Sequence, residues 1–407
     1  MSILTELNET AVWEEFLQYK IQHRHLSEKK QGEWETFIRE ERYRAVTERL
    51  NEPDYVFEPP EKISVNKSGT GKKRIVYSYS ETESMVLKAM VYLLYRYDEK
   101  ISPRCFSFRK SSSAKEAISQ ILRMKNLEKK YCLKVDISNY FNSIPTESLI
   151  EVLKGILGDD EMLLRFLVRL LSDGRAVENG TVIREERGAM AGIPIAPFFA
   201  NLYLLSMDLE FEQRGIAYFR YSDDILLFAD SREELSEHET LLREHIAKKG
   251  LEINQEKVSV RSPGEEWEFL GFCYREGTVD LSRITINKMK AKIRRKARAL
   301  YRRRTRRNQE FASAAKALIR IFNLKYFDET EENRFTWSRW FFPVITTDLG
   351  LRELDEYLVR YVRYLYKGRH YKGNYRITYE EIKQLGFRSL VHEYYKWKED
   401  SFPRNKI

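Results

Sequence analysis

The sequence predicts an α+β protein in which strands that carry carboxylates alternate with helices. Residues 131–137 form an apolar run with the composition of a buried strand, and Asp136 stands near its end. Residues 217–229 have the pattern of two strands joined by a tight turn, because Ser and Asp favour turns while Tyr, Phe, Ile and Leu favour strands. Residues 232–249 then have the apolar spacing of an amphipathic helix. This alternation favours a sheet with helices on one face.

Length, charge and cysteine content limit the class of protein. The chain has 407 residues, enough for two or three domains, and its net charge of +9 favours an anionic partner, with nucleic acid first. The three cysteines lack the paired spacing of a zinc site or disulfide framework and fit a reducing compartment. No apolar run approaches the roughly 18 residues of a membrane helix. We therefore expect a cytoplasmic protein without membrane contact.

Composition changes along the chain divide it into four expected segments. The first has the spacing of two helices, over residues 6–22 and 29–50, and ends near a turn-forming Asn-Glu-Pro-Asp sequence. The third segment has a helical pattern from residue 287 to about 322, and the first half of that stretch is strongly basic. We expect an N-terminal helical segment, a sheet-containing region, a basic helical segment and a C-terminal helical extension, over residues 1–55, 56–278, 279–330 and 331–407.

Three aspartates at strand ends are the main candidates for chemistry. Asp136 ends a buried strand, where an unpaired carboxylate is costly. Asp223 and Asp224 lie at the tip of the expected hairpin, and adjacent carboxylates raise each other's pKa unless a cation neutralises them. A hard, oxygen-seeking ion such as Mg²⁺ is the usual partner. The alternative is an ordinary hairpin turn, since Asp and Ser are also plain turn formers.

Basic residues occur at three places that could hold phosphates. A glycine-containing turn ends in Lys72, Lys73 and Arg74, although a solvated charged hairpin is the alternative. Arg109 precedes a Ser-rich helix start, whose backbone amides point outward. Residues 282–309 contain thirteen Lys or Arg and no Asp or Glu, which exceeds the net charge of the whole chain. Like charges on one helix repel, so contact with nucleic-acid phosphates explains them better than a solvated face. The candidates in this segment are Lys292, Arg294, Arg295, Arg298, Arg302 and Arg303.

Two further stretches have unusual composition. Residues 188–205 begin with helix-breaking Gly and Pro residues and continue as a helical run, and a glycine such as Gly192 would let a substrate or template approach the backbone closely. Residues 336–395 are rich in aromatic side chains beside arginines. Such a helix could stack bases. An aromatic stripe is more often core, and we expect core here.

The candidate motifs occur together in a known order. Asp136, residues 188–205, the Tyr-Ser-Asp-Asp turn, Lys257 and the Glu-Phe-Leu-Gly-Phe run at 268–272 follow the order of the reverse transcriptase palm motifs. The chain resembles a bacterial RNA-directed DNA polymerase over residues 67–272, about half its length. The resemblance implies a right-hand polymerase fold, with fingers and palm over the second segment, a basic helical thumb, and a C-terminal helical extension.

The resemblance also implies roles for the catalytic residues. Asp136 and Asp223 match the two principal metal-binding aspartates, and Asp224 matches a neighbour that shapes the site. They would hold two Mg²⁺ ions, with Mn²⁺ as an alternative. Lys257 resembles the lysine proposed to protonate the departing pyrophosphate. Phe141 stands where the family carries a bulky steric gate that favours deoxynucleotides.

Substrate contacts are implied in the same way. Lys72, Lys73 and Arg74 match the fingers element that holds the triphosphate, and Arg109 and Gly192 lie in segments similar to other nucleotide-contacting motifs. Leu270 and Gly271 resemble the primer grip. The sequence departs from the family where Met-Ala-Gly at 190–192 replaces Pro-Gln-Gly, and the missing glutamine keeps a template-independent polymerase as an alternative. The turn has Ser222 where Ala is commoner in the family. This difference leaves both carboxylates in place.

The remaining sequence narrows the subfamily. No Cys/His cluster follows the thumb, unlike typical mobile-intron proteins, and the Val-Thr-Gly signature of retron enzymes is absent. Residues 337–348 and 379–396 resemble the bacterial defence-associated reverse transcriptases of the unknown group, type 2. The resemblance implies an enzyme that copies a dedicated non-coding RNA into DNA from dNTPs in antiphage defence, with a partner protein left open. The alternatives are a retron-like or intron-like reverse transcriptase, a template-independent DNA polymerase, a nuclease, and a non-catalytic RNA-binding scaffold.

Overall fold

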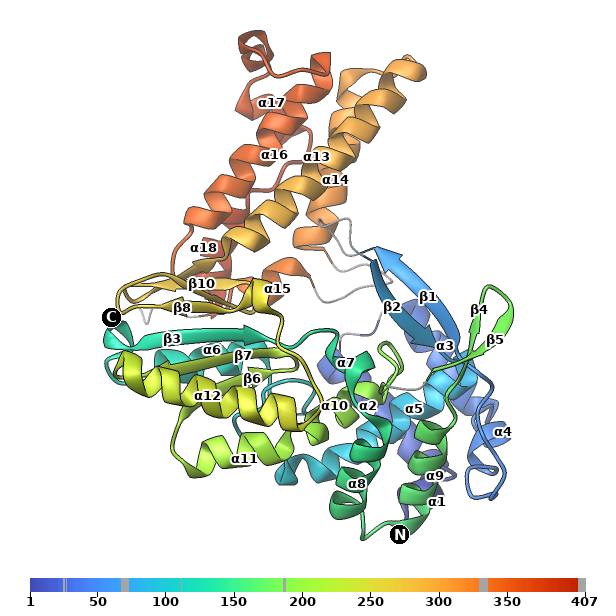
Figure 1. Cartoon of the computed structure of the whole chain (residues 1–407). Coiled ribbons are helices and arrows are strands. Elements are labelled where there is room, and N and C mark those ends of the chain that lie inside the picture. The colour runs from blue at the N-terminus through green and yellow to red at the C-terminus, as the bar shows by residue number, and fades with distance from the viewer. Residues whose placement is uncertain are drawn as a thin grey trace, which may run out of the picture. The chain divides into compact units, whose positions relative to one another are not determined.

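The computed structural model describes residues 1–24, 26, 28–66, 73–110, 112–185, 188–328 and 336–401 (Figure 1). They form two compact units, one of residues 1–23 and 31–265 and the other of residues 24–30 and 266–407. Helices and strands both occur in each unit, which confirms the predicted α+β class. No helix in the described ranges is both long and apolar enough to cross a membrane.

Helices dominate the N-terminal part of the first unit. They are α1 (Ile3–Glu6), α2 (Thr10–Arg24), α3 (Glu28–Arg39), α4 (Arg44–Thr47) and α5 (Glu81–Leu94). Aromatic side chains hold α2 against α3, as the ring centroids of Phe16 and Trp34 lie 5.2 Å apart. The expected helix over residues 29–50 ends early, because Glu41 adopts a left-handed φ of 47°.

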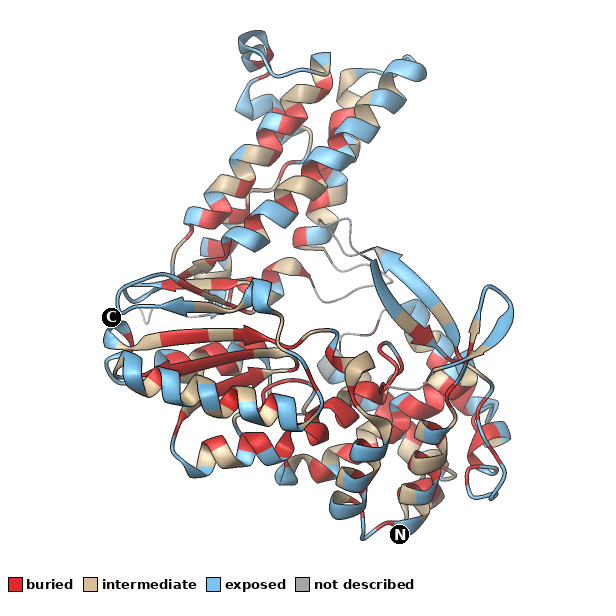
Figure 2. Ribbon diagram, in the orientation of Figure 1, coloured by how far each residue is buried: buried red, intermediate tan, exposed pale blue. Residues whose placement is uncertain are grey.

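A four-stranded sheet, here called the central sheet, carries the aspartates. Its strands lie in the order β6 (Ala217–Tyr221), β7 (Asp224–Ala229), β3 (Tyr131–Asp136) and β8 (Ser259–Arg261), all antiparallel. The predicted strand and hairpin are therefore confirmed. Helix α12 (Arg232–Lys248) packs on β3 and β7, and α11 (Leu205–Gln213) packs on β6. Most residues of β3, β6 and β7 are buried (Figure 2).

A second sheet of the first unit has the order β2 (Lys73–Ser78), β1 (Glu61–Asn66), β4 (Arg175–Glu178) and β5 (Thr181–Arg184). Strand β1 pairs antiparallel with β2 and parallel with β4. The other helices of this unit are α6 (Ala114–Leu122), α7 (Tyr140–Ser143), α8 (Thr146–Ile156), α9 (Glu161–Ser172) and α10 (Ala196–Tyr203). The predicted helical run after the breakers at 188–197 is thus α10.

The second unit joins a small sheet to a group of packed helices. The sheet is β9 (Trp267–Phe269), β10 (Phe272–Arg275) and β11 (Thr278–Leu281). The helices are α13 (Arg283–Arg306), α14 (Phe311–Tyr326), α15 (Trp337–Phe341), α16 (Leu349–Lys367), α17 (Tyr379–Gln384) and α18 (Leu390–Ser401). Helix α13 packs against α14 and α16. The helical stretch expected over residues 287–322 is confirmed and consists of the basic helix α13 and of α14, with Asn308 at a left-handed φ of 48° between them.

Candidate active site

The central sheet brings the three predicted aspartates together. In the antiparallel register Asp136, the last residue of β3, lies opposite Asp224, the first residue of β7. Tyr221 pairs with Asp224, so Ser222 and Asp223 are the two residues of the turn. The Ile137 amide donates to the Asp223 carbonyl at 3.1 Å, which fixes the turn beside the end of β3. Two strand ends far apart in sequence therefore present their carboxylates at one place.

Two lysines contact these carboxylates. The Lys257 Nζ lies 2.6 Å from Asp136 Oδ2, so the predicted catalytic lysine is in the site. The Asn254 amide donates to the Asp136 carbonyl at 2.8 Å, which holds the segment that carries Lys257 against β3. The Lys134 Nζ lies 3.4 Å from Asp224 Oδ1. Each ammonium offsets part of the repulsion between the carboxylates.

Burial and mutual repulsion act on the two hairpin aspartates. Burial raises the pKa of Asp223, and the negative charge of Asp136 raises it further. Burial also raises the pKa of Asp224, while the ammonium of Lys134 opposes that rise. Both effects disfavour the ionised form, and a bound cation would reverse them. The site is therefore one at which a cation would be stabilising.

The residues present fit a hard divalent ion. Among the described residues, no group of three or more His, Cys, Asp or Glu side chains is placed to hold a metal. Mg²⁺ usually binds through one or two carboxylates and takes its other ligands from substrate phosphates and water. Asp136 and Asp223 match that pattern, with oxygen ligands only.

A buried ion pair fixes the conformation of the turn. Arg220 is fully buried on β6, and its guanidinium donates to both carboxylate oxygens of Asp208, on α11. The same guanidinium donates to the carbonyls of Ser222, at 3.2 Å, and Asn201, at 3.3 Å. The Ser222 amide donates to the Ser107 hydroxyl at 2.9 Å. These bonds hold Ser222 at its left-handed φ of 62°. Asp223 is the next residue, so its position in the turn depends on them.

This network was not predicted from the sequence. Arg220 interrupts an otherwise apolar strand, and a charge at a buried strand position requires a partner. That pattern could have identified Arg220. Its partners Asp208 and Asn201, and the Ser107 that binds Ser222, are supplied by other elements, so no local pattern indicates them.

Breaking the buried pair is expected to destabilise the first unit strongly. Asp208→Asn leaves the Arg220 guanidinium buried without its counter-charge, which typically costs about 3–5 kcal/mol. The matched control is Arg214→Gln, which breaks the exposed pair between Arg214 and Glu210 at the C-terminal end of the same helix. That change is expected to cost less than about 1 kcal/mol. Urea unfolding of both variants measures the difference, and equal losses would contradict this account of the turn.

A pocket of about 290 Å³ lies between the second sheet and the loop that follows Asp136. Its lining consists of Lys62, Lys73, Arg74, Ile75, Tyr77, Asn139, Asn142 and Glu185. The pocket therefore combines two predicted triphosphate ligands, Lys73 and Arg74, with residues next to Phe141. Lys62 is paired with Glu185 at 2.7 Å. Lys72 lies outside the described residues, so its predicted role stays a prediction.

The predicted steric gate lies in an aromatic cluster. Phe141 is half-buried on α7, and its ring centroid is 6.3 Å from that of Phe108. The Phe108 ring is also 6.4 Å from that of Tyr221, beside the turn. Phe108 is 41% exposed and has a φ of 55°. Phe108 was not predicted from the sequence, because an aromatic residue in a Ser-rich stretch has no distinctive pattern.

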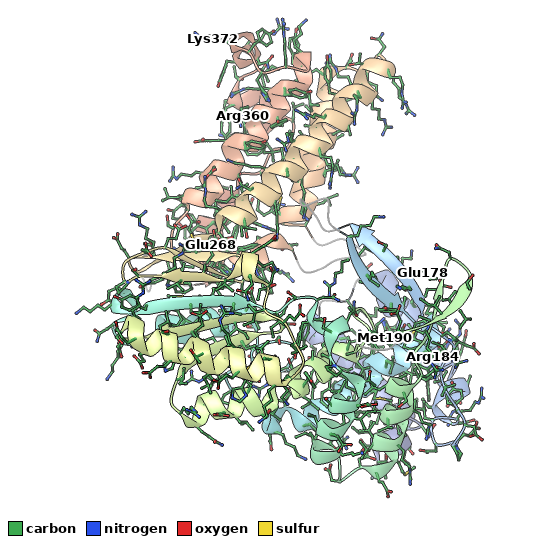
Figure 3. The ribbon with its side chains drawn as sticks, viewed as in Figure 1. Glu178, Arg184, Met190, Glu268, Arg360 and Lys372 are labelled. Carbon is green, nitrogen blue, oxygen red and sulfur yellow. The ribbon has the colours of Figure 1, made fainter. Side chains whose placement is uncertain are left out.

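Gly192 and Arg109 make structural contacts. A Cβ on Gly192 would lie 2.9 Å from the Tyr77 carbonyl, and the residue has a φ of 108°, so close packing against β2 requires glycine. Gly192 lies in the loop before α10, in which Figure 3 labels Met190. The Arg109 guanidinium donates to the carbonyls of Asp98, Ser102 and Cys105. Nucleotide contact by either residue stays a prediction.

The remaining predicted residues belong to the second unit. Leu270 and Gly271, with φ of 53° and 89°, are the two turn residues of the β9–β10 hairpin. The Gly271 carbonyl accepts bonds from the Ser282 amide and the Thr285 hydroxyl, which ties the hairpin to the start of α13. On α13, Lys292 is half-buried, and burial followed by the charge of Lys325 lowers its pKa. The other predicted residues are exposed, namely Arg294, Arg295, Arg298, Arg302 and Arg303.

Comparison with known proteins gives several similarities. The "Retron Ec86 reverse transcriptase" of Escherichia coli is 24% identical over 167 residues, which cover 40% of this chain and 48% of that protein. This chain thus matches about half the length of that relative. The apo telomerase structure from Candida tropicalis has a TM-score of 0.46 at 13% identity, covering 84% of this chain and 68% of that one. A form of it truncated from the C-terminal domain has a TM-score of 0.44 at 13% identity, covering 56% of each chain.

A family model decides the classification. The model described as "Reverse transcriptase (RNA-dependent DNA polymerase)" matches residues 65–274, slightly more than half of the chain. The match contains the aspartates, Lys257, Phe141 and the pocket residues Lys73 and Arg74. Domains of this family generally use divalent metal ions, in agreement with the carboxylate pair. The predicted right-hand polymerase fold is confirmed, and the chain belongs to the reverse transcriptase (RNA-dependent DNA polymerase) family.

Proposed function

We propose that this protein is an RNA-directed DNA polymerase that copies a dedicated non-coding RNA into DNA. The observation that supports it best is the convergence of Asp136 and Asp223, with Lys257 on the Asp136 carboxylate at 2.6 Å. The pocket that contains Lys73 and Arg74 adds a place for a triphosphate near the loop that follows Asp136. A role in antiphage defence is part of the proposal, on the resemblance of residues 337–348 and 379–396.

Metal ions would supply part of the chemistry. Asp136 and Asp223 would hold two Mg²⁺ ions, which activate the primer 3′-hydroxyl and stabilise the pyrophosphate leaving group. In the reaction the 3′-oxygen attacks the α-phosphorus of the dNTP, and the bond from that phosphorus to the bridging oxygen breaks. Mn²⁺ is the alternative ion. Asp224, held by Lys134, contributes negative charge beside the pair.

The protein's own groups would align and neutralise the substrates. Lys73 and Arg74 would bind the triphosphate, because guanidinium and ammonium groups form charge-assisted bonds with phosphate. Lys257 carries a proton beside the site and would donate it to the departing pyrophosphate. The ring of Phe141 would occupy the space that a ribose 2′-hydroxyl needs. Alignment and charge stabilisation account for most of the catalysis of such transfers.

Product analysis tests the proposal. The full-length protein, purified with the RNA that accompanies it, is incubated with Mg²⁺ and either dNTPs or rNTPs. We expect synthesis of DNA only, and we expect none after RNase treatment that precedes the reaction. DNA synthesis that survives this treatment would support a template-independent polymerase. Mg²⁺-dependent degradation without nucleotides would support a nuclease, and RNA retention without either reaction would support a scaffold.

A further inference from the structure

A row of aromatic rings lies on one side of α16. Tyr357, Tyr361 and Tyr364 are spaced at i, i+4 and i+7, with ring centroids 4.9 and 5.5 Å apart. His370, in the loop after the helix, lies 4.9 Å from Tyr361 and 5.2 Å from Tyr364. Tyr361 is buried, whereas Tyr357 and Tyr364 are half-buried and His370 is exposed. The buried residues of α16 are Leu, Val and Gly residues together with Tyr361, whereas Tyr357 and Tyr364 stay partly exposed, so the aromatic row extends beyond the core stripe that the sequence predicts.

Arginines from two helices surround this row. Burial lowers the pKa of His370, and the charges of Arg360 and Arg298 lower it further. Burial raises the pKa of Tyr361 to about 12, whereas the positive charges of Arg298 and Arg294 lower it. Arg360 also lies over the Tyr357 ring, at 4.8 Å from its centroid. Arg360 of α16 thus contacts one ring of the row directly, and Arg294 and Arg298 are carried by α13, which packs against α16.

These arginines have no carboxylate partner among the residues that the structure describes. At the start of α13, Arg283 and Lys290 both pair with Glu353 of α16. Arg294, Arg298 and Arg360 form no ion pair with a carboxylate anywhere in the described ranges. The second half of α13 therefore differs from the first, where α16 provides the counter-charge. An anionic partner would supply what the fold does not.

The loop beyond α16 extends the same chemistry. Arg363 lies 4.9 Å from the ring centroid of Tyr375, which is 67% exposed, and Arg369 lies 5.2 Å from that of Tyr371. No Asp or Glu occurs between residues 357 and 376. Figure 3 labels Arg360 on α16 and Lys372 in this loop. Planar guanidinium and phenol groups therefore continue past the helix end.

We propose that this surface binds an unpaired stretch of the RNA that the enzyme copies. The surface, here called the tyrosine–arginine patch, consists of Arg294, Arg298, Tyr357, Arg360, Tyr364 and His370. The proposal rests on the proposed function, which supplies the RNA. In this proposal α16 and its loop hold RNA together with the basic face of α13. These elements select unpaired nucleotides.

The aromatic rings of the patch favour unpaired over paired nucleic acid. A duplex hides the faces of its bases, so only the arginines of the patch would act on it, through phosphates. Unpaired RNA exposes base faces that stack on Tyr, His and Arg side chains. Stacking contributes about 1–3 kcal/mol per base. A surface that combines partly exposed rings with free guanidinium groups is therefore suited to single-stranded segments.

Binding of three labelled probes to the full-length protein tests this inference. The probes are an unstructured 15-nucleotide RNA, the DNA of the same sequence, and the blunt duplex of that RNA with its complement. Tyr357→Leu/Tyr364→Leu is expected to weaken binding of the single-stranded RNA about 10-fold or more, with little change for the duplex. Arg360→Gln is expected to reduce the slope of log Kd against log salt by about 0.7 for the single strand.

Matched controls make the outcome decisive. Arg283→Gln removes one exposed positive charge from the same helix pair outside the patch, and its Kd is expected to stay within about 2-fold of wild type. Thermal unfolding checks that the ring variant and Arg360→Gln are folded, since Arg360 is exposed but lies over the Tyr357 ring. Ring variants that bind single-stranded RNA like wild type would overturn the proposal. Tighter binding of the DNA strand than of the RNA strand would overturn the assignment to RNA.

The same experiment separates the patch from the proposed function. The binding assay contains no nucleotides, so it does not depend on catalysis. Ring-dependent RNA binding by a protein that synthesises no DNA would refute the proposed function alone. DNA synthesis by a protein whose RNA binding is independent of the rings would refute the patch alone.

Discussion

Asp223→Asn is expected to abolish DNA synthesis, with a loss of about a thousand-fold or more. Asn keeps the shape of the side chain and removes the charge that would hold a divalent ion with Asp136. Metal ions supply several kcal/mol of charge stabilisation in such reactions, and each 1.36 kcal/mol is about tenfold in rate. The initial rate of dNTP incorporation measures the effect. The proposed role in defence further predicts that cells expressing this variant with the non-coding RNA lose phage protection.

Stability separates this loss of activity from unfolding. Burial and the charge of Asp136 both raise the pKa of Asp223, so the ionised carboxylate is unfavourable in the metal-free protein. Removing its charge should leave the free energy of unfolding unchanged or increase it. Asp230→Asn is the control, since Asp230 is exposed just after β7 and pairs with Lys130. It should retain activity within about 2-fold, because surface ion pairs contribute little. An Asp223→Asn protein with near wild-type synthesis would contradict the assigned site.

Phe141→Ala is expected to reduce discrimination against ribonucleotides by about 10–100-fold. A 2′-hydroxyl forced against the ring costs about 1–3 kcal/mol by overpacking, and removal of the ring ends that cost. The measurement is the ratio of kcat/KM for a dNTP to that for the matching rNTP. The change should come mainly from faster use of the ribonucleotide.

Two variants locate the gate within the aromatic cluster. Phe141→Tyr keeps the ring and should retain discrimination. Phe108→Ala removes the neighbouring ring, 6.3 Å from that of Phe141, and should have a smaller effect, because Phe108 supports the gate from one side. A larger effect of Phe108→Ala than of Phe141→Ala would move the gate assignment to Phe108.

Local patterns in the sequence predicted the elements that carry the site. The strand that ends at Asp136 and the hairpin around Asp223 were predictable, because an apolar run and turn residues determine such elements locally. Proximity of Asp136, Asp223 and Lys257 was implied by motif order alone. The structure supplies the physical basis, namely the register of β3 against β7 and the contact of Lys257 with Asp136.

Contacts between residues far apart in the chain could not be predicted from the sequence. Arg220 depends on Asp208 and Asn201 from two other helices, and no local spacing links the three residues. The ends of helices within polar segments were also missed, because Glu41 and Asn308 adopt left-handed conformations that their neighbours do not indicate. Which tyrosines of α16 are buried and which are partly exposed depends on the packing partner of the helix, and the sequence does not give that partner.

Addition of single nucleotides to a DNA primer annealed to a defined RNA template tests the central claim most directly. Four templates that differ only in the first unpaired base are each offered the four dNTPs separately, with Mg²⁺. We predict that the protein adds only the dNTP complementary to that base. Addition of the same dNTP on all four templates would contradict RNA-directed synthesis and identify a template-independent polymerase.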